Sequence, residues 1–456
     1  MNQRVYVINS QVKKEGDYVL YLPLYSLRIS YNYSLKEAIG LSNYLRKPLF
    51  IYFPLSKRAG LKTLRHLLFL LEGLIEFEES LRNFGLSLFV KPEEDLFEGL
   101  RRFAKRAVLV ISDFTYLKEE KTLWESFSKV ESVPLFLVEG NVVVPARVVS
   151  KKAEPYARTL RPKLQALWQR FFNDCSFDVP KEGGFLPEEE GLSLKELLRD
   201  EKALFSLCEK LDLDKSVSPV GTYFKGGYKE ALQKLDSFLN EKFTYYAEAR
   251  SEPGYEIESN LSPYLRYGFI SPVEVLKKIL ERFPFEDPNV KSFFNELVIW
   301  RELARNFTLY NLFYDSFYGL PSWARDTLKE HEGDPREHLY ELSELERGEV
   351  SDPIWRCAQR ELLLRGKIHN YVRMYWCKRL IFWSKTPEEA FKICLYLNNK
   401  YALDGDDPNS FLGVAWCFGA FDHPFVDRPV LGKVRAFTLK ALKRKESLSL
   451  YLKKWS

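Results

Sequence analysis

The chain has 456 residues, of which 46% are hydrophobic, 15% aromatic and 29% charged, and its formal net charge is +5. This length predicts two or three domains, and so apolar a composition excludes an intrinsically disordered chain. The mild positive charge allows a basic patch but does not by itself require a nucleic acid partner.

The first part of the chain alternates short apolar runs with amphipathic segments. Strands are expected at residues 18–24, 48–55, 86–91, 107–113 and 134–139, with residues 5–10 as an extra edge strand. Helices are expected between them, at residues 34–45, 61–84 and 94–105. Because such alternation favours a parallel sheet covered by helices, residues 1–142 are expected to form a Rossmann-like α/β domain.

Residues 143–220 are expected to be an interdomain linker. They mix extended and helical signals and include a loop rich in proline, glycine and charge, FDVPKEGGFLPEEEG. From about residue 221 onward the pattern is almost entirely helical, without internal repeats. The sequence therefore predicts an all-helical domain at residues 221–456.

Several common catalytic and cofactor motifs are absent from the sequence. It contains no GxGxxG, no GxxxxGK[ST], no HExxH and no GxSxG. Its five histidines leave little for acid–base or metal chemistry, and its six scattered cysteines form no CxxC pair, which indicates reduced thiols. No metal is expected, because no cluster of histidines and cysteines has the spacing of a metal site. No apolar run reaches 18 residues and the N-terminus lacks a signal-peptide profile, so we expect a cytoplasmic protein.

Residues 368–383 are expected to form a helix with an unusual set of side chains, IHNYVRMYWCKRLIFW. Seven residues fall about 20° short of two helical turns, so Trp376 and Trp383 share a face, and His369, Arg373 and Leu380 extend that stripe. An arginine on an otherwise apolar face requires an anion, and the run LDGDDPNS at residues 403–410 offers three carboxylates. Two interpretations stay open: indoles used in function, or an aromatic core stripe with an Arg–Asp pair.

Two proline-containing motifs indicate helix starts. Ser262 followed by Pro263 predicts an N-cap with proline at the first helical position, where free N–H groups attract anions. The hydroxyls of Ser259 and Ser262 would add hydrogen bonds to a phosphate; the alternative is a cap alone. The sequence SPVE at residues 271–274 predicts a capping box.

Glu296 and Trp300 lie four residues apart in NELVIWREL, on one face of another expected helix. Polar and aromatic side chains that face inward indicate the wall of a pocket. The alternative is a solvated charged face with one buried tryptophan.

Five segments, in this order, together resemble the photolyase/cryptochrome family, and specifically the class II cyclobutane pyrimidine dimer (CPD) photolyases. They are SNLSPYLRYGFISP, NELVIWRELARNF, SDPIWRCAQRELLLRGKIHNYVRMYWCKRLIFW, YLNNKYALDGDDPNSF and WCFGAFDHPFVDRPVLGKVR. The segment RVVSKKAEPYARTLRPK also looks like the family's linker. The resemblance covers nearly the whole chain and is strongest at residues 246–435.

The resemblance implies a deoxyribodipyrimidine photo-lyase whose helical domain binds FAD. In this family reduced FAD absorbs blue light and passes an electron to a pyrimidine dimer, whose ring splits before the electron returns, so the protein needs no acid–base motif. Asn398 is implied to lie near the flavin N5, and Arg373 to pair with Asp404. The implied cofactor-binding residues are Tyr246, Ser259, Asn260, Leu261, Ser262, Asn370, Arg373, Asp404, Asp406 and Asp407.

The resemblance also implies an electron relay and a lesion site. Trp376, Trp355 and Trp383 are its expected proximal, middle and outer members. Glu296 is expected to hydrogen-bond the dimer, which must leave the DNA helix to reach a buried cofactor. The implied substrate contacts are Arg250, Trp300, Met374, Trp416, Arg428 and Arg435. A basic run either extends this surface or is a solvated helix face; it comprises Lys440, Lys443, Arg444 and Lys445.

The expected partner is UV-damaged DNA, double- or single-stranded, bound by a monomer without a membrane. The N-terminal domain would hold an antenna chromophore, a deazaflavin or a folate, or none. One alternative is a cryptochrome-like blue-light sensor without repair activity. Another is a (6-4) photoproduct enzyme, which calls on pocket histidines, whereas only His369 and His423 lie near the motifs.

Some positions depart from the family pattern. The usual LDGRDPNG reads LDGDDPNS here, so Asp406 replaces an arginine and Ser410 a glycine. An expected Asp-Arg pair reads Asp422-His423, and Ser251 stands where asparagine is usual. These changes are expected to affect contacts with DNA more than flavin binding.

Overall fold

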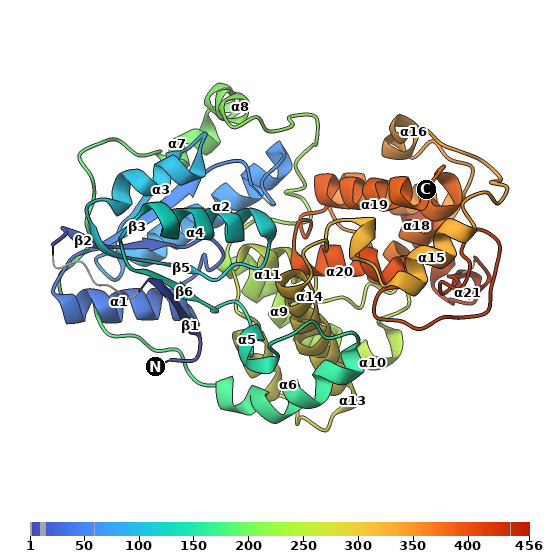
Figure 1. The fold of residues 1–456 in the computed structure, drawn as a ribbon, viewed down its shortest axis with the longest axis horizontal. Helices are drawn as coiled ribbons and strands as arrows, with labels where there is room; N and C mark the ends of the chain where they lie inside the picture. Colours follow the sequence, from blue (N-terminus) through green and yellow to red (C-terminus); the bar gives the residue numbers. More distant parts are fainter. Residues whose placement is uncertain (1, 10–14, 59, 438) are drawn as a thin grey trace. The chain divides into compact units, whose positions relative to one another are not determined.

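A computed structural model describes residues 2–9, 15–58, 60–437 and 439–456 of the chain (Figure 1). Its strands form one six-stranded sheet in the order β1-β6-β5-β2-β3-β4. They are β1 (Val5–Asn9), β2 (Tyr18–Leu22), β3 (Leu49–Leu55), β4 (Leu88–Pro92), β5 (Ala107–Asp113) and β6 (Leu135–Val138). Each strand lies at the position of one of the expected strands, although residue 10 of the expected edge strand lies outside the described residues.

The sheet is mixed rather than wholly parallel, which corrects the expectation. β2 pairs in parallel with β3 and β5, but β1 runs antiparallel to β6, with Val5 opposite Val138. Crossover helices fix the direction of the inner strands, whereas no such helix connects β1 to its neighbour. The strand order reverses between β2 and β5, so loops at the carboxyl ends of these strands meet at a topological switch point.

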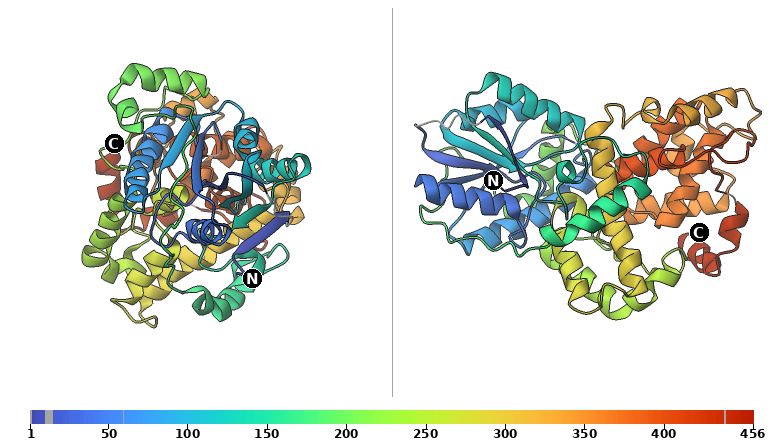
Figure 2. Two further views of the ribbon diagram at one scale, coloured as in Figure 1. Left: turned by 90° about the vertical axis from the view of Figure 1, so that its left-hand side faces the viewer. Right: turned by 60° about the horizontal axis from the view of Figure 1, so that its bottom comes forward.

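Helices lie on both faces of the sheet, with α1 (Tyr33–Leu45) on one face and α3 (Leu96–Ala104) and α4 (Lys118–Val130) on the other (Figures 1 and 2). The strands β2, β3 and β5 are buried along their whole length, as strands covered on both faces must be. Helix α2 (Leu64–Arg82) starts later than expected because the Thr63 hydroxyl caps it by accepting from the His66 N–H.

The rest of the chain is mostly helical, as expected. The expected linker contains α5 (Ala146–Val149), α6 (Ala157–Phe171), α7 (Leu194–Arg199) and α8 (Glu201–Lys210). The following helices are α9 (Tyr228–Glu241), η1 (Phe243–Tyr245), α10 (Tyr246–Ala249), α11 (Ser262–Tyr267), α12 (Pro272–Leu280), α13 (Pro288–Phe294), η2 (Asn295–Trp300), α14 (Arg301–Tyr310), η3 (Phe317–Gly319), α15 (Ser322–Glu330), α16 (Leu342–Arg347), α17 (Pro353–Arg365), α18 (Asn370–Trp383), α19 (Pro387–Tyr401), α20 (Pro408–Cys417), α21 (Leu439–Lys443) and α22 (Leu448–Trp455).

Two of the expected helix starts differ from the structure. Ser262 is the first residue of α11 rather than its N-cap, because Leu261 already has near-helical backbone angles. Ser271 caps α12 as expected, but the Glu274 carboxylate accepts from the hydroxyls of Ser30 and Tyr228 instead of completing a capping box.

The chain divides into two compact units whose limits differ from the expected domain boundaries. Unit 1 comprises residues 1–149, 164–235 and 261–282, and unit 2 comprises residues 150–163, 236–260 and 283–456. Aromatic packing explains why residues 261–282 join unit 1, since Phe69 of α2 contacts the rings of Tyr264, Tyr267 and Phe269. The chain therefore passes between the units several times.

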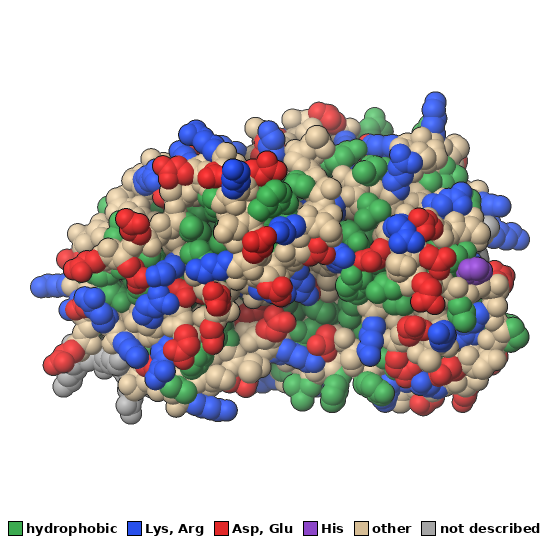
Figure 3. All heavy atoms as spheres, turned by 90° about the horizontal axis from the view of Figure 1, so that it is seen from above, with side chains coloured by type: hydrophobic (Ala, Val, Ile, Leu, Met, Phe, Trp, Pro, Cys, Tyr) green, Lys and Arg blue, Asp and Glu red, His purple; other side chains and the backbone are tan. Residues whose placement is uncertain are grey.

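The surface seen in Figure 3 carries basic and acidic side chains interspersed with one another, in keeping with the small net charge of +5. Across the described part of the chain, no helix combines the length and apolarity needed to cross a bilayer.

Candidate functional site

Three tryptophans from α17 and α18 form a row of contacting rings inside unit 2. The rings of Trp355 and Trp376 are nearly parallel, at 11°, with centroids 5.9 Å apart. The ring of Trp383 meets the other side of Trp355 edge-on, at 5.5 Å and 69°. The order is therefore Trp376, Trp355, Trp383, which is the order expected for the relay.

The indole N–H groups of Trp355 and Trp376 have partners. Trp355 Nε1 donates to the backbone oxygen of Trp376 at 3.0 Å, and Trp376 Nε1 donates to Gln359 Oε1 at 3.0 Å. Gln359 is itself buried on α17. These bonds fix both rings, as buried indoles require.

The outermost tryptophan of the row, Trp383, is not at the surface. Exposed fractions are 1% for Trp376, 0% for Trp355 and 2% for Trp383. The last turn of α18 is covered by the loop that precedes α16, where the Tyr340 ring meets Trp383 edge-on at 5.1 Å. Sequence spacing places a residue on a face of a helix but does not show what covers that face.

The expected pair of Arg373 and Asp404 is confirmed. Arg373 Nη1 donates to Asp404 Oδ1 at 3.1 Å, and Nη2 donates to Oδ2 at 3.3 Å, in a fork geometry. Helix α18 begins at Asn370, so His369 is its N-cap residue rather than part of the helical stripe. Asn370 is exposed and Arg373 only partly buried.

Asn398 belongs to a hydrogen-bond network that sequence reasoning missed. Its Nδ2 donates to Ser410 Oγ at 2.7 Å and to Asn399 Oδ1 at 3.1 Å. Ser410 also donates its hydroxyl to Asn399 Oδ1. Asn399 Nδ2 in turn donates to Asp406 Oδ1 at 2.9 Å, and the Asp406 N–H donates back to Asn399 Oδ1 at 3.1 Å. All four residues are buried.

Asp407 has a structural role in the same turn. Its carboxylate caps α20 by accepting from the Asn409 N–H at 2.9 Å, and it accepts from Arg305 Nη2 at 3.1 Å. Both partners of this ion pair are buried. The carboxylates of Asp404, Asp406 and Asp407 are thus held by three different partners.

Glu296 and Trp300 lie on η2, a π-helical turn between α13 and α14. Such turns are uncommon and occur frequently at functional sites. Arg250 Nη2 lies 2.7 Å from Glu296 Oε1, and both side chains are about 30% exposed. The sequence predicted both residues for the site but not their ion pair.

The expected substrate contacts Trp300, Met374 and Trp416 are all partly exposed in unit 2. The guanidinium of Arg435 lies 5.9 Å from the Trp416 ring centroid, and it forms a fork with the Asp422 carboxylate at 2.6 and 3.0 Å. Arg428 is exposed in the same loop.

Ionisable side chains of unit 2 lie beside Asn260, one of the residues expected to contact phosphate. Glu258 pairs with Lys367 at 3.0 Å, and Arg365 pairs with Glu361 at 2.7 Å while donating to Asn260 Oδ1 at 2.9 Å. Burial raises the pKa of Glu258, but Lys367, His369 and Arg365 outweigh this effect and hold that pKa below its usual value.

The other residues expected to bind the cofactor are placed as follows. Tyr246 is buried against Phe243 and Phe293, Ser259 is partly exposed, and Asn260 has a left-handed backbone with φ of 56°. Leu261 is buried and Ser262 partly exposed, and both belong to unit 1.

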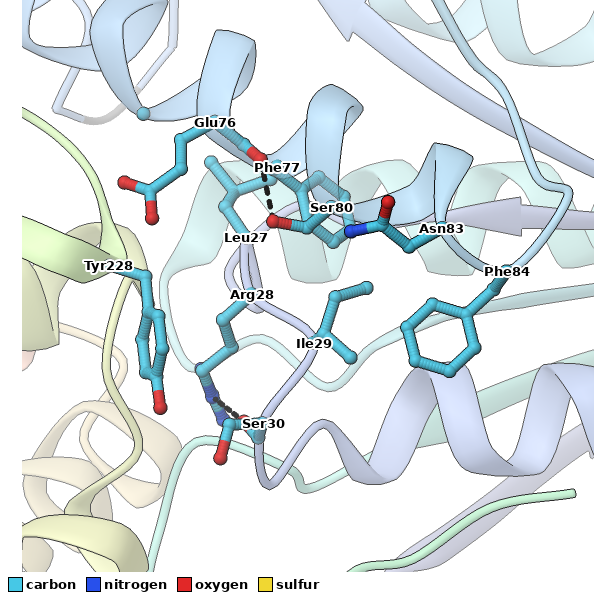
Figure 4. A pocket seen from close by; sticks show the side chains of 11 residues that line it. Leu27, Arg28, Ile29, Ser30, Glu76, Phe77, Ser80, Asn83, Phe84 and Tyr228 are labelled. Carbon is cyan, nitrogen blue, oxygen red and sulfur yellow. Dashed lines mark hydrogen bonds between the residues drawn. The ribbon is translucent and has the colours of Figure 1, made fainter.

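Unit 1 contains a pocket of about 290 Å³ beside the loop that follows β2 (Figure 4). Apolar walls come from Leu27, Ile29, Phe77 and Phe84, and the Tyr228 phenol closes another side. Its polar lining includes Arg28, Ser30, Glu76, Ser80 and Asn83. Its volume is at the lower end for small-molecule sites.

Comparison with known proteins places the chain among light-dependent DNA repair enzymes and their relatives. The family described as DNA photolyase matches residues 19–181. The chain is 37% identical over 437 residues to a deoxyribodipyrimidine photo-lyase of Methanothermobacter thermautotrophicus, an alignment that covers 96% of this chain and 94% of that protein. The chain belongs to the photolyase/cryptochrome family.

Another photo-lyase and two solved structures are also similar to this chain. The deoxyribodipyrimidine photo-lyase of Arabidopsis thaliana is 31% identical, over 95% of this chain and 88% of that protein. A class III photolyase from Agrobacterium tumefaciens has the same fold, with a TM-score of 0.72 at 20% identity, covering 98% of this chain and 88% of that one. A cryptochrome from Synechocystis also has this fold, with a TM-score of 0.70 at 16% identity, covering 97% of this chain and 89% of that one. The expected family, fold class and type of enzyme are therefore confirmed.

Proposed function

We propose that this member of the family is a class II photolyase, which repairs cyclobutane pyrimidine dimers by light-driven electron transfer from reduced FAD to a flipped-out dimer. The row of Trp376, Trp355 and Trp383 carries the proposal. Three contacting indoles, two with fixed N–H groups, are more than a core requires, and indoles transfer single electrons where leucines do not. The photo-lyase names of relatives that align with nearly the whole chain supply the substrate class.

The residues present fit FAD. Among the described residues, Arg373 Nε is buried without a hydrogen-bond partner. Buried polar atoms of this kind cost stability unless a further group pairs with them. A cofactor rich in ring nitrogens, carbonyls and phosphate oxygens offers such partners, and when reduced it supplies the electron for repair.

We assign the binding of FAD to residues of two kinds. Arg373, which Asp404 holds in place, and Asn370 would line the cofactor, with Asn398 beside its ring. Asp406 and Asp407 would act through Asn399 and Arg305, to which they are bonded. The residues assigned to the rest of the cofactor are Tyr246, Ser259, Asn260, Leu261 and Ser262.

Lesion recognition is assigned to the surface that contains Glu296. Its carboxylate would exchange the bond to Arg250 for one to the dimer, which frees Arg250 to meet a DNA phosphate. Trp300, Met374 and Trp416 would enclose the flipped bases, because stacking on exposed aromatic rings offsets part of the cost of unpairing them. Arg428 and Arg435 would contact the DNA backbone.

The pocket of unit 1 is our candidate for an antenna chromophore. A flat, mostly apolar ring system such as a deazaflavin suits walls made by Phe77, Phe84 and Ile29 (Figure 4). Arg28, Ser80 and Tyr228 offer polar contacts at its edges. An absorption band beyond those of FAD in the purified protein would support this assignment.

A repair assay under light and in the dark tests the proposed function. The protein with reduced FAD should restore thymine-dimer oligonucleotides only when illuminated, and it should leave (6-4) photoproducts unchanged. Glu296→Gln should lower repair while FAD content is retained, and Glu349→Gln, at an exposed site, serves as the matched control. Photoreduction of FAD without any dimer repair would instead establish the blue-light sensor.

A further inference from the structure

A histidine at the C-terminal end of α15 lies between two carboxylates. His331 Nδ1 is 2.6 Å from Asp334 Oδ2, and His331 Nε2 is 3.1 Å from Asp427 Oδ1. Ionised carboxylates only accept hydrogen bonds, and a neutral imidazole has a single N–H to donate. The two bonds together therefore require the protonated ring, which joins α15 to the loop of residues 422–435.

Two further hydrogen bonds fasten the backbone of this loop to the same place. Asp334 Oδ2 also accepts from the Val430 N–H at 2.7 Å, and the Thr327 hydroxyl on α15 accepts from the Lys433 N–H at 3.0 Å. Neither of these two bonds depends on a group that titrates near neutral pH, whereas the bonds of His331 do. Protonation of one side chain thus changes how the loop is held.

Asp427 directly precedes Arg428, the exposed arginine that we assign to a DNA phosphate. The Asp427 side chain is 55% exposed, so its charge would repel the phosphate that Arg428 attracts. A protonated His331 offsets that charge and holds Asp427 in place. Arg428 and Gly432 exchange backbone hydrogen bonds of 3.1 and 2.8 Å, so the turn that carries the arginine is fixed together with Asp427.

The other charges around His331 do not reverse this effect. Arg336 donates to the backbone oxygens of His331 and Asp334, at 3.4 and 2.8 Å, and Lys329 and Glu332 pair with each other at 2.8 Å. The hydrogen bond to Asp334, with a smaller contribution from Asp427, raises the pKa of His331 above its usual 6.5. The proton is bound below this raised pKa and is lost as the pH rises through it.

We propose that His331 is a positioning residue for DNA binding, whose protonated ring compensates Asp427 and holds the loop so that Arg428 meets a phosphate. This inference rests on the proposed function, because it takes the loop of residues 422–435 as part of the DNA surface. Loss of the proton removes one of the two hydrogen bonds and leaves the Asp427 charge uncompensated. DNA affinity should therefore fall as the pH rises above the usual range of histidine titration.

The test is the pH profile of the Kd for a thymine-dimer duplex, measured by fluorescence anisotropy at constant salt between about pH 6 and 9. The wild-type Kd should rise several-fold across this range. His331→Asn should bind weakly with a nearly flat profile, and His331→Lys, which stays charged, should bind tightly throughout. Asp427→Asn should also bind tightly at every pH, because no negative charge is left to compensate.

Two other histidines of unit 2 provide matched controls. His338 is exposed outside the loop, and His423 lies within it, 3.4 Å from Asp422 Oδ1. The pH dependence should persist in both His338→Asn and His423→Asn. A His331→Asn variant that unfolds at lower urea concentration but keeps the wild-type profile would overturn the inference and leave this histidine a structural role. Failure of the wild type to prefer thymine-dimer DNA at any pH would instead contradict the proposed function.

Discussion

The tryptophans of this protein differ in exposure, so their replacement should have different effects. Trp376 is 1% exposed in the row, whereas Trp416 is partly exposed beside Arg435. Trp376→Phe should block photoreduction of oxidised FAD but leave repair by pre-reduced enzyme nearly intact, because the relay is not on the repair path. Trp416→Ala should retain photoreduction and weaken lesion binding by about 1–3 kcal/mol, the value of one base stack. Photoreduction of Trp376→Phe at the wild-type rate would contradict this division.

Arg373 is held by a single carboxylate, and its removal should release the cofactor. Arg373→Ala removes the fork that the guanidinium makes with the largely buried Asp404 carboxylate, at a cost of about 3 kcal/mol, the lower end for a broken buried ion pair. We expect purified Arg373→Ala to contain little FAD and to unfold at lower urea concentration. Arg373→Lys keeps the charge but not the fork and should be intermediate. Full FAD content in Arg373→Ala would exclude Arg373 from the binding site.

Ser410 replaces a glycine of the family pattern, and its hydroxyl joins Asn398 to Asn399. Ser410→Ala should destabilise the fold by about 1 kcal/mol, because the buried Asn398 amide loses one acceptor. It should also shift the reduction potential of bound FAD if Asn398 lies beside the flavin ring. Urea unfolding and a redox titration measure the two effects separately, and a changed stability with an unchanged potential would confine Ser410 to a structural role.

At the scale of elements, the contact of α18 with α19 and α20 buries an amine without a partner. Lys378 is 1% exposed, and its Nζ has no hydrogen bond among the described residues. Burial lowers the pKa of Lys378 from 10.5 to about 8. The unfolded chain therefore binds more protons than the folded one between about pH 8 and 10.5, so this group makes stability rise with pH across that range.

Lys378→Met should raise the free energy of unfolding at pH 7 by up to about 3 kcal/mol, since the cost of burying a charge disappears. The gain should shrink as the pH rises through 8 and be small near 10.5. Urea unfolding of the wild type and Lys378→Met at several pH values measures this gain in free energy. A gain that is equal at all pH values would mean that apolar packing, and not charge, is responsible.

For the whole molecule, a small net charge predicts that specific DNA contacts, rather than a general attraction, dominate binding. Each arginine that neutralises a phosphate steepens the dependence of affinity on salt. Arg428→Ala should reduce the slope of log affinity against log salt by about 0.9 and weaken damaged and undamaged duplex alike. Arg347→Ala, at an exposed ion pair, is the control. An unchanged slope would remove Arg428 from the DNA surface.

The sequence predicted those features that local chemistry determines. The strands were predictable because short apolar runs end at turn residues, and the partner of Arg373 because an arginine on an apolar helix face requires an anion. The direction of β1 could not be predicted, since no crossover connection constrains it. Neither the Ser410 network nor the cover that Tyr340 forms over Trp383 was predictable, because each depends on how side chains from separate elements meet.

The π-helical turn η2 makes the position of Glu296 depend on a single residue. A π-helical turn contains one residue more than an α-helical turn, so α13 is rotated by about 100° relative to α14 compared with a continuous α-helix. Deleting one residue within Asn295–Trp300 would allow an uninterrupted helix that keeps nearly every apolar side chain but turns the Glu296 carboxylate away from Arg250. In evolutionary terms, one codon inserted into a plain packing helix is enough to create this carboxylate site, and one lost codon is enough to erase it.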